Sequence, residues 1–440
     1  MNILFISLGC DKNLADSETM LGMLASRGYQ IVDEEEKADV IIVNTCCFIH
    51  DAMEESIETI LQMAEYKKSG SLKALIVTGC MAERYREEIT KEIPEVDAVL
   101  GTASYGHILD AVDEALKGHS YLMMEPLDTL PLIETHRLVT TGGHYAYLKI
   151  AEGCDKHCTY CIIPKLRGNF RSVPMDHLIK EAEQLAADGV KELILVAQET
   201  TLYGKDLYGE KKLPELLHKL CQISGIRWIR ILYCYPEEIT EELIQTMKEE
   251  PKICHYLDLP IQHASDGILK RMGRRTSKEE LVHIISRLRE EIPDITLRTT
   301  LITGFPGETQ EQHEELMDFV DEMEFDRLGV FTYSPEEGTP AASMPDQIEE
   351  SIKEDRRAEL MELQQEIAFE QAENMIGKEV LVMIEGKVAD ENAYVGRTYK
   401  DAPNVDGLIF VNTDAELMSG DFAKVKVTGA CEYDLIGELM

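Results

Sequence analysis

Three cysteines in one short run carry the clearest chemical signal in the chain. Cys154, Cys158 and Cys161 stand in Gly-Cys-Asp-Lys-His-Cys-Thr-Tyr-Cys, with the spacing C-x3-C-x2-C. Three thiolates this close together can bind three irons of a [4Fe–4S] cluster and leave the fourth iron open to a small molecule. The spacing therefore predicts a cluster that takes part in chemistry and does not only store electrons.

Two other interpretations of this loop stay open. Closely spaced cysteines also bind zinc, but a structural zinc site needs four ligands, and His157 would have to be the fourth. Alternatively, the three cysteines are reduced packing residues, although the Asp-Lys-His between the first two makes the loop polar. Spacing and context favour the iron–sulfur cluster.

The same loop resembles the signature of radical S-adenosylmethionine enzymes, in which an aromatic residue precedes the third cysteine. Tyr160 holds that position here. The resemblance implies that the open iron binds the amino and carboxylate groups of S-adenosylmethionine. It also implies that Tyr160 packs beside the cluster and this cofactor.

Three further cysteines follow predicted strands near the start of the chain. Apolar strands over 3–8, 40–44 and 74–78 alternate with amphipathic helices near 15–27, 51–67 and 84–92, which predicts an α/β fold with a doubly wound parallel sheet. Cys10, Cys46 and Cys80 lie just beyond the three strands. Because carboxyl ends of parallel strands share one edge of a sheet, these thiols should meet there. This placement predicts a second metal cluster.

Cys47 competes with Cys46 for a place in that second site. Neighbouring side chains in an extended segment point in opposite directions, so only one of the two should face the other thiols. The four remaining cysteines are isolated in the sequence and are expected to be packing residues: Cys221, Cys234, Cys254 and Cys431.

A second series of strands and helices follows a predicted linker at 118–144, where the periodicity is lost. Six units of this kind predict a partial (βα)6, TIM-like barrel with its active site at the carboxyl ends of the strands. The cysteine loop follows the first of these strands, so the first cluster should lie at that end. The expected strands are 147–150, 193–197, 228–232, 256–259, 296–302 and 328–331.

The last part of the chain has a different character. Residues 346–375 form a long amphipathic stretch, which predicts one or two helices. Short β-prone runs at 379–384, 394–397, 407–411 and 422–428 then predict a small all-β barrel of about five strands. The expected domains are 1–117, a linker at 118–144, 145–375 with trailing helices, and 376–440.

Charge and hydropathy limit the partners of the protein. The 440-residue chain has a formal net charge of −38, and such a surface repels phosphate backbones and attracts basic partners. A nucleic acid is therefore not expected as a direct substrate. No apolar run is long enough to span a membrane, and the N-terminus lacks the pattern of a signal peptide, so we expect a cytoplasmic protein. In such a chain, eleven cysteines favour metal ligation over disulfides.

The domain order resembles that of the methylthiotransferases, which have an N-terminal three-cysteine domain, a radical S-adenosylmethionine domain and a C-terminal TRAM barrel. The resemblance covers essentially the whole chain and implies two [4Fe–4S] clusters, one for each cysteine triplet. In this family Asn-Thr-Cys corresponds to residues 44–46, and a serine commonly stands at the position of Cys47. The resemblance therefore implies that Cys46 is the ligand.

Two branches of this family modify different molecules. One acts on an adenosine in tRNA, and the other on an aspartate of a small-subunit ribosomal protein, S twelve. Cys-Asp-Lys-Asn-Leu at 10–14 and Asp155 resemble the ribosomal-protein branch, because the tRNA branch usually has Gln-Met-Asn after its first cysteine and Asn at the position of Asp155. The acidic chain also suits a basic ribosomal protein or the small ribosomal subunit. The tRNA substrate is the alternative, and an iron–sulfur or zinc regulator without enzyme activity is a third hypothesis.

The resemblance also implies a mechanism. An aspartate β-carbon has no acidic proton, so a 5′-deoxyadenosyl radical formed from S-adenosylmethionine abstracts its hydrogen, and the second cluster presents the sulfur. A second S-adenosylmethionine supplies the methyl group, and an electron donor such as flavodoxin or ferredoxin is expected as a partner. The cofactors carry the difficult steps, and the protein positions them and excludes water.

Besides Tyr160, four residues near the ends of predicted barrel strands are candidate contacts to S-adenosylmethionine. Each also has a purely structural interpretation. Gln198 and Gln262 are loop residues that would cap strand ends, Arg298 would pair with a neighbouring carboxylate, and Gly304 would serve a turn.

Overall fold

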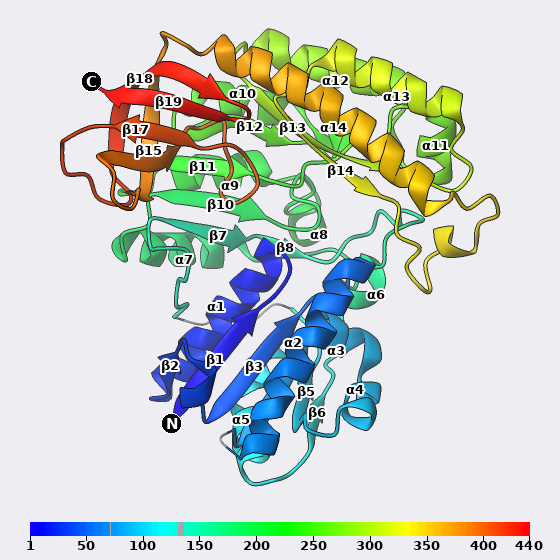
Figure 1. Ribbon diagram of the computed structural model, residues 1–440, viewed down its shortest axis with the longest axis vertical. Coiled ribbons are helices and arrows are strands. Elements are labelled where there is room, and N and C mark those ends of the chain that lie inside the picture. Colours follow the sequence, from blue (N-terminus) through cyan, green and yellow to red (C-terminus); the bar gives the residue numbers. More distant parts are fainter. Residues whose placement is uncertain (71, 131–135) are drawn as a thin grey trace.

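The computed structural model describes residues 1–70, 72–130 and 136–440, which fold into an N-terminal sheet domain, a central partial barrel and a small C-terminal barrel (Figure 1). The predicted fold class is thereby confirmed. The predicted linker includes residues 131–135, which lie outside the described residues. The exact domain bounds stay a prediction.

The N-terminal domain is a doubly wound sheet whose six strands are all parallel, in the order β2-β1-β3-β4-β5-β6. Apolar residues of α1 and α5 pack on one face, and those of α2, α3 and α4 pack on the other. The strands are β1 (Asn2–Ser7), β2 (Gln30–Val32), β3 (Val40–Thr45), β4 (Ala74–Gly79), β5 (Ala98–Leu100) and β6 (Tyr121–Met123). The helices are α1 (Asp11–Ser26), α2 (His50–Ser69), α3 (Cys80–Tyr85), α4 (Glu87–Glu92) and α5 (Ile108–Leu116), with short 3-10 turns at Glu35–Lys37 and Tyr105–His107.

Three details of this domain differ from the prediction. The helix expected over 84–92 is two helices, because the backbone turns at Arg86, whose φ is +46°. The first helix begins at Asp11 instead of 15, so Cys10 directly precedes it. β6 belongs to the sheet although its residues fall within the predicted linker, since three residues are too few to show a periodic pattern.

The central domain is an open, six-stranded parallel sheet in the order β14-β13-β12-β11-β10-β7. Its helices pack outside the sheet and enclose the largest apolar core of the protein. The strands are β7 (Tyr145–Lys149), β10 (Glu192–Val196), β11 (Trp228–Ile231), β12 (Ile253–Asp258), β13 (Thr296–Thr303) and β14 (Arg327–Thr332), with a short pair β8 (Ala151–Glu152) and β9 (Arg171–Ser172). The longer helices are α7 (Met175–Ala187), α9 (Leu213–Cys221), α10 (Glu241–Glu249), α12 (Lys278–Glu291), α13 (Gln310–Met323) and α14 (Glu350–Glu373). The shorter ones are α6 (Ile163–Arg167), α8 (Lys205–Tyr208) and α11 (Asp266–Arg271), with 3-10 turns at Pro236–Glu238 and Ala341–Ser343.

The C-terminal domain is a closed five-stranded barrel in the order β15-β16-β17-β19-β18. Its last strand was not among the predicted runs, because only two residues separate it from β18. The strands are β15 (Glu379–Lys387), β16 (Ala393–Arg397), β17 (Ile409–Asn412), β18 (Phe422–Cys431) and β19 (Asp434–Leu439).

This small barrel is packed against the amino ends of the central strands (Figure 1). Arg397 pairs with Glu192, the first residue of β10, at 2.7 Å, and Glu192 also pairs with Arg230 at 2.8 Å. All three side chains are fully buried. Trp228, the first residue of β11, stacks edge-on against Phe422 with ring centres 4.9 Å apart. The amino end of the open barrel is therefore covered, and the carboxyl end, where the cysteine loop lies, faces the N-terminal domain.

We predict that Arg397→Met destabilises this interface by about 3–5 kcal/mol, because it leaves Glu192 buried with one cation instead of two. Trp228 is the only tryptophan of the chain and contacts the C-terminal barrel, so its fluorescence during urea unfolding reports on this interface. Arg357→Met is the control. It breaks the exposed Arg357–Glu354 pair, which contributes about 0–1 kcal/mol. Equal midpoints for the two variants would contradict the prediction.

Candidate active site

The cysteine loop of the central domain is fixed by backbone hydrogen bonds. It follows β7 and β8, where the amide of Cys154 donates to the carbonyl of Gly168 at 3.1 Å. The amide of Thr159 donates to the carbonyl of Met272 at 2.9 Å. Asp155, at whose position the two branches of the methylthiotransferases usually differ, accepts a hydrogen bond from the amide of Phe170 at 3.0 Å. The loop therefore has a defined shape built by the protein alone.

Gln198 lies beside the start of this loop. Its Oε1 accepts a hydrogen bond from the amide of Gly153 at 2.9 Å, and its Nε2 donates to Oε1 of Glu152 at 2.7 Å. The predicted residue is thus at the predicted place, two positions beyond β10. Both ends of its amide group are used to orient the loop, which differs from the strand-end cap expected as its structural role, and its contact to a cofactor stays a prediction.

Lys156 anchors the middle of the loop, and the sequence analysis did not single it out. The buried ammonium group pairs with Glu238 at 2.5 Å, Glu237 at 3.2 Å and Glu199 at 3.8 Å. Burial raises the pKa of Glu199 to about 7. The sequence showed only a lysine inside a cysteine-rich loop. Its role could not be predicted, because its partners are distant in the sequence: Glu199 lies beyond β10, and Glu237 and Glu238 lie beyond β11.

An arginine with unused donors lies next to the cysteines. The guanidinium group of Arg274 stacks on the ring of Tyr235 at 4.3 Å and donates through Nη2 to a backbone carbonyl. Its Nε and Nη1 atoms are buried without a hydrogen-bond partner. Its positive charge interacts electrostatically with Cys158 and Tyr160. Tyr160 itself packs partly buried against a small apolar cluster. A buried cation with free N–H groups fits an anionic group, such as a carboxylate or a thiolate-bound cluster.

The fold brings the three N-terminal cysteines together, as the parallel topology predicts. Burial raises the pKa of Cys46 to about 12, and the neighbouring Cys80 and Cys10 add to this shift. Cys10 precedes α1 and Cys80 begins α3, so both lie at helix N-termini, which favour thiolates. Gly9 has a φ of +86°, and a Cβ there would be 2.6 Å from Cβ of Cys46. Only glycine allows this close approach.

Cys46 and Cys47 occupy different surroundings. Cys47 is 0% exposed and belongs to the apolar core between β3, α2 and α3. Cys80 is near both of them, but it is Cys46 that lies against Gly9, the neighbour of Cys10. This arrangement favours Cys46 as the member of the triplet, in agreement with strand alternation.

Nearby backbone amides favour the thiolate form of three cysteines. The amide two residues later opposes the rise in thiol pKa that burial causes: that of Lys156 for Cys154, Ile163 for Cys161 and Phe48 for Cys46. Burial nonetheless raises the pKa of Cys154 to about 11, and a metal lowers such a pKa by binding the thiolate. The residues therefore fit iron–sulfur clusters. In the described part of the chain no three His, Cys, Asp or Glu side chains converge tightly enough for one metal ion, whereas three thiolates of a cluster bind three different irons.

The other predicted contacts to S-adenosylmethionine have structural roles. Gln262 lies beyond β12 with a φ of +73° and forms an isolated β-bridge with Leu301 of β13. Its Nε2 donates to the carbonyl of Pro260 at 3.4 Å. Gly304 follows β13 with φ +71°, and a Cβ there would meet Lys353 at 2.3 Å. Both lie at carboxyl ends of strands, as predicted. Their contacts to a cofactor stay predictions.

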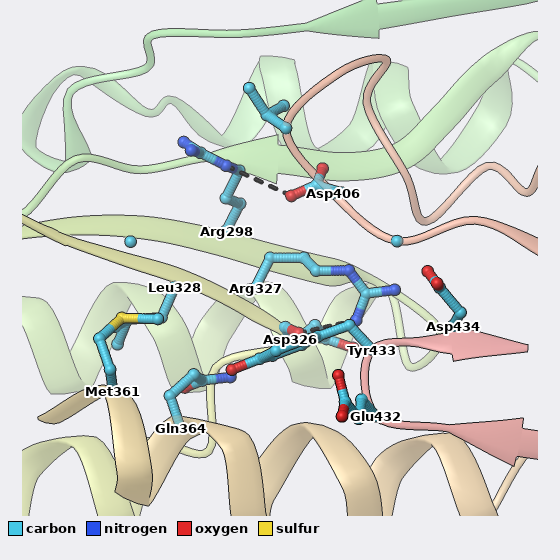
Figure 2. Close-up of a pocket in the computed structure, with 13 residues that line it drawn as sticks. Arg298, Asp326, Arg327, Leu328, Met361, Gln364, Asp406, Glu432, Tyr433 and Asp434 are labelled. Carbon is cyan, nitrogen blue, oxygen red and sulfur yellow. Dashed lines mark hydrogen bonds and ion pairs between the residues drawn. The ribbon is translucent and has the colours of Figure 1, made fainter. Parts of the chain in front are cut away.

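Arg298 is not next to the cysteine loop. It pairs with Asp258 at 2.8 Å and Asp406 at 3.4 Å, which is the ion pair given above as its alternative. It lines a cavity of about 340 Å³ between β13, β14 and loops of the C-terminal barrel. Figure 2 shows it there with Arg327 and Asp434. Its position inside β13 rather than beyond its end explains the difference.

Comparisons with known proteins agree with this architecture. The uncharacterised protein family UPF0004 matches residues 2–101, the radical SAM superfamily matches 148–320, and the TRAM domain matches 376–440. A protein of Lachnoclostridium phytofermentans named ribosomal protein uS12 methylthiotransferase RimO is 66% identical over 437 residues, covering 99% of both chains. A protein of Clostridioides difficile with the same name is 50% identical over 440 residues, covering 100% of this chain and 99% of the relative.

The chain belongs to the RimO family of radical S-adenosylmethionine methylthiotransferases. Membership of this family implies S-adenosylmethionine and a [4Fe–4S] cluster as cofactors. Among solved structures, the methyltransferase TsrM of Kitasatospora setae covers 88% of this chain and 81% of its own, with a TM-score of 0.54 and 12% identity. The enzyme OxsB covers 77% and 54%, with a TM-score of 0.55 and 14% identity. These two share the fold with this RimO family member. No described helix is both long and apolar enough to cross a membrane.

We predict that Gln198→Ala weakens the cysteine loop, because it removes hydrogen bonds to the Gly153 amide and to charged Glu152 that together contribute about 2–4 kcal/mol. The measurement is iron retained per chain after anaerobic reconstitution and gel filtration, with the expected loss confined to one cluster. Gln222→Ala, which removes an exposed amide with a weak 3.5 Å contact, is the control. Equal iron in the two variants would show that Gln198 does not support the loop.

Proposed function

We propose that this protein attaches a methylthio group to the β-carbon of an aspartate in ribosomal protein uS12, in the cytoplasm. The observation that carries the proposal is the arrangement of two cysteine triplets on facing domains, at the one end of the barrel that the C-terminal domain leaves uncovered. The name of the relatives supports the substrate. So does the chain's net charge of −38, because a basic ribosomal protein is attracted to such a surface.

Two [4Fe–4S] clusters are part of this proposal. Cys154, Cys158 and Cys161 would hold one, and Cys10, Cys46 and Cys80 would hold the other. When bound, the clusters and S-adenosylmethionine would supply the radical, the sulfur and the methyl group. A small electron-transfer protein such as flavodoxin or ferredoxin would deliver the electrons.

The protein's own residues would bind and orient these groups. Arg274 offers two unpaired N–H groups beside the first triplet, which suits the cofactor's carboxylate. Tyr160 lies on the first cysteine loop, and Gln198 lies against its start. Gln262 and Gly304 lie at the ends of the neighbouring strands β12 and β13. The buried ion pairs at the opposite end of the barrel keep water from entering through the amino ends of the strands.

The C-terminal barrel favours a protein substrate over tRNA. Acidic residues outnumber basic ones in it. Two of its basic residues are also engaged with the central domain, Arg397 with Glu192 and Lys400 with Asp326. A surface that binds a phosphate backbone needs clustered, available cations.

The direct test is anaerobic incubation of the reconstituted protein with S-adenosylmethionine, a reductant and uS12, followed by mass measurement of uS12. We expect a mass gain equal to the replacement of one hydrogen by a methylthio group, located on an aspartate. An unmodified uS12, together with a modified tRNA and salt-sensitive tRNA binding, would contradict the proposal and support the tRNA alternative.

The second cluster can be tested with two adjacent cysteines. We predict that Cys46→Ala lowers iron from about eight to about four per chain, as the loss of one [4Fe–4S] cluster requires. Cys47→Ala is the matched control, because its thiol packs in the apolar core and its loss leaves a small cavity only. Loss of iron from Cys47→Ala, with full iron in Cys46→Ala, would reverse the ligand assignment.

A further inference from the structure

α6 starts two residues after the first cysteine triplet and ends beside the second. Its residue Leu166, together with Ile162 just before it, is buried in the apolar core of the N-terminal domain, although both belong to the central domain by sequence. The hydroxyl of Thr102 donates to the carbonyl of Leu166 at 2.6 Å. α6 is therefore held by the N-terminal domain, and Figure 1 shows it close to α3.

Arg167, the last residue of α6, reaches from this helix to the N-terminal cysteine site. Its guanidinium donates to Oδ2 of Asp16 at 2.8 Å and to Oδ1 of Asn13 at 2.5 Å. Asn13 in turn donates to the carbonyls of Leu8 and Thr45, both at 2.9 Å, which lie next to Cys10 and Cys46. Arg167 thus supports, through Asn13, the loops that carry two cysteines of the second triplet. Burial raises the pKa of the third, Cys80, and the nearby positive charge of Arg167 opposes this rise.

The charges around Arg167 are balanced and buried. Arg167 and Lys149 are the two cations, and Asp16 and Glu152 are the two anions, with exposed fractions of 3–9%. Glu152, which accepts from Arg167 at 3.1 Å, is also the partner of Gln198 at the first cysteine loop. Of the two cations, Arg167 is the one that donates to Asn13, beside the loops of Cys10 and Cys46. A thiolate cluster at these cysteines would therefore add negative charge close to Arg167.

We propose that Arg167 is a positioning residue that, through Asn13, holds the loops of Cys10 and Cys46 in place for the second cluster and tunes the reduction potential of that cluster. The proposal rests on the proposed function, because it requires a cluster at Cys10, Cys46 and Cys80. Hydrogen bonds to ligand sulfurs and nearby charge are among the factors that set the potential of an iron–sulfur cluster. A cation at this place stabilises the more negative, reduced form and so raises the potential.

The test is potentiometric titration of the two clusters, followed by EPR, in the full-length reconstituted protein and three variants. Arg167→Gln removes the charge and shortens the donor. Arg167→Lys keeps the charge but loses the planar fork that serves several acceptors at once. Lys149→Met is the matched control, because it removes one cation from the same four charges and leaves the hydrogen bond between Arg167 and Asn13 in place.

We expect Arg167→Gln to shift the midpoint potential of the second cluster to more negative values and that of the first cluster less than half as far. Arg167→Lys should give a smaller shift of the same sign, and Lys149→Met a shift below half that of Arg167→Gln. If Arg167→Gln loses the second cluster while Lys149→Met keeps both, the positioning role is supported by iron content alone.

Two results would overturn the proposal. One is an unchanged second potential in Arg167→Gln with full iron. The other is an equal effect, on potential or on iron, in Lys149→Met, which would assign the effect to general charge balance. A wild-type protein with only one cluster would instead refute the two-cluster part of the proposed function, before any variant is compared.

Discussion

The contact of Arg167 with the N-terminal cysteine site is the constraint on which the arrangement of the two domains depends. A short helix follows the first cysteine triplet, packs its apolar residues into the neighbouring domain and ends in a cation that donates to Asn13 beside the second triplet. Removing one partner of a buried charge group costs several kcal/mol, because the remaining charges lose compensation in a medium of low polarity. The sites therefore cannot separate without exposing apolar surface and breaking these pairs.

The opposite end of the barrel is fixed by the same kind of interaction. Glu192 is buried between Arg230 of the central domain and Arg397 of the C-terminal barrel. This packing makes the C-terminal domain a cover for the amino ends of the strands as well as an acidic surface. The cysteine triplets lie at the other end of the barrel, which faces the N-terminal domain.

The sequence predicted the cysteine sites better than their surroundings. Strand ends in a parallel sheet are determined by local patterns, so the meeting of Cys10, Cys46 and Cys80 followed from topology. Arg167, Lys156 and Arg274 were missed because their partners are distant in sequence and leave no periodic signal. Arg298 was expected at the strand end, but it lies within β13 and pairs with carboxylates. The break at Arg86 was missed because a non-glycine residue with a positive φ leaves no sequence signal, and the strand β6 because three residues are too few to show a periodic pattern.

The most direct test of this account is a crystal structure of the reconstituted protein with the irons located by anomalous scattering. The account predicts two iron peaks on either side of Arg167, one at Cys154, Cys158 and Cys161 and the other at Cys10, Cys46 and Cys80, with the guanidinium still bound to Asn13. A single iron peak would contradict it. A second iron peak that lies away from Cys80, with the side chain of Arg167 exposed to solvent, would also contradict the account.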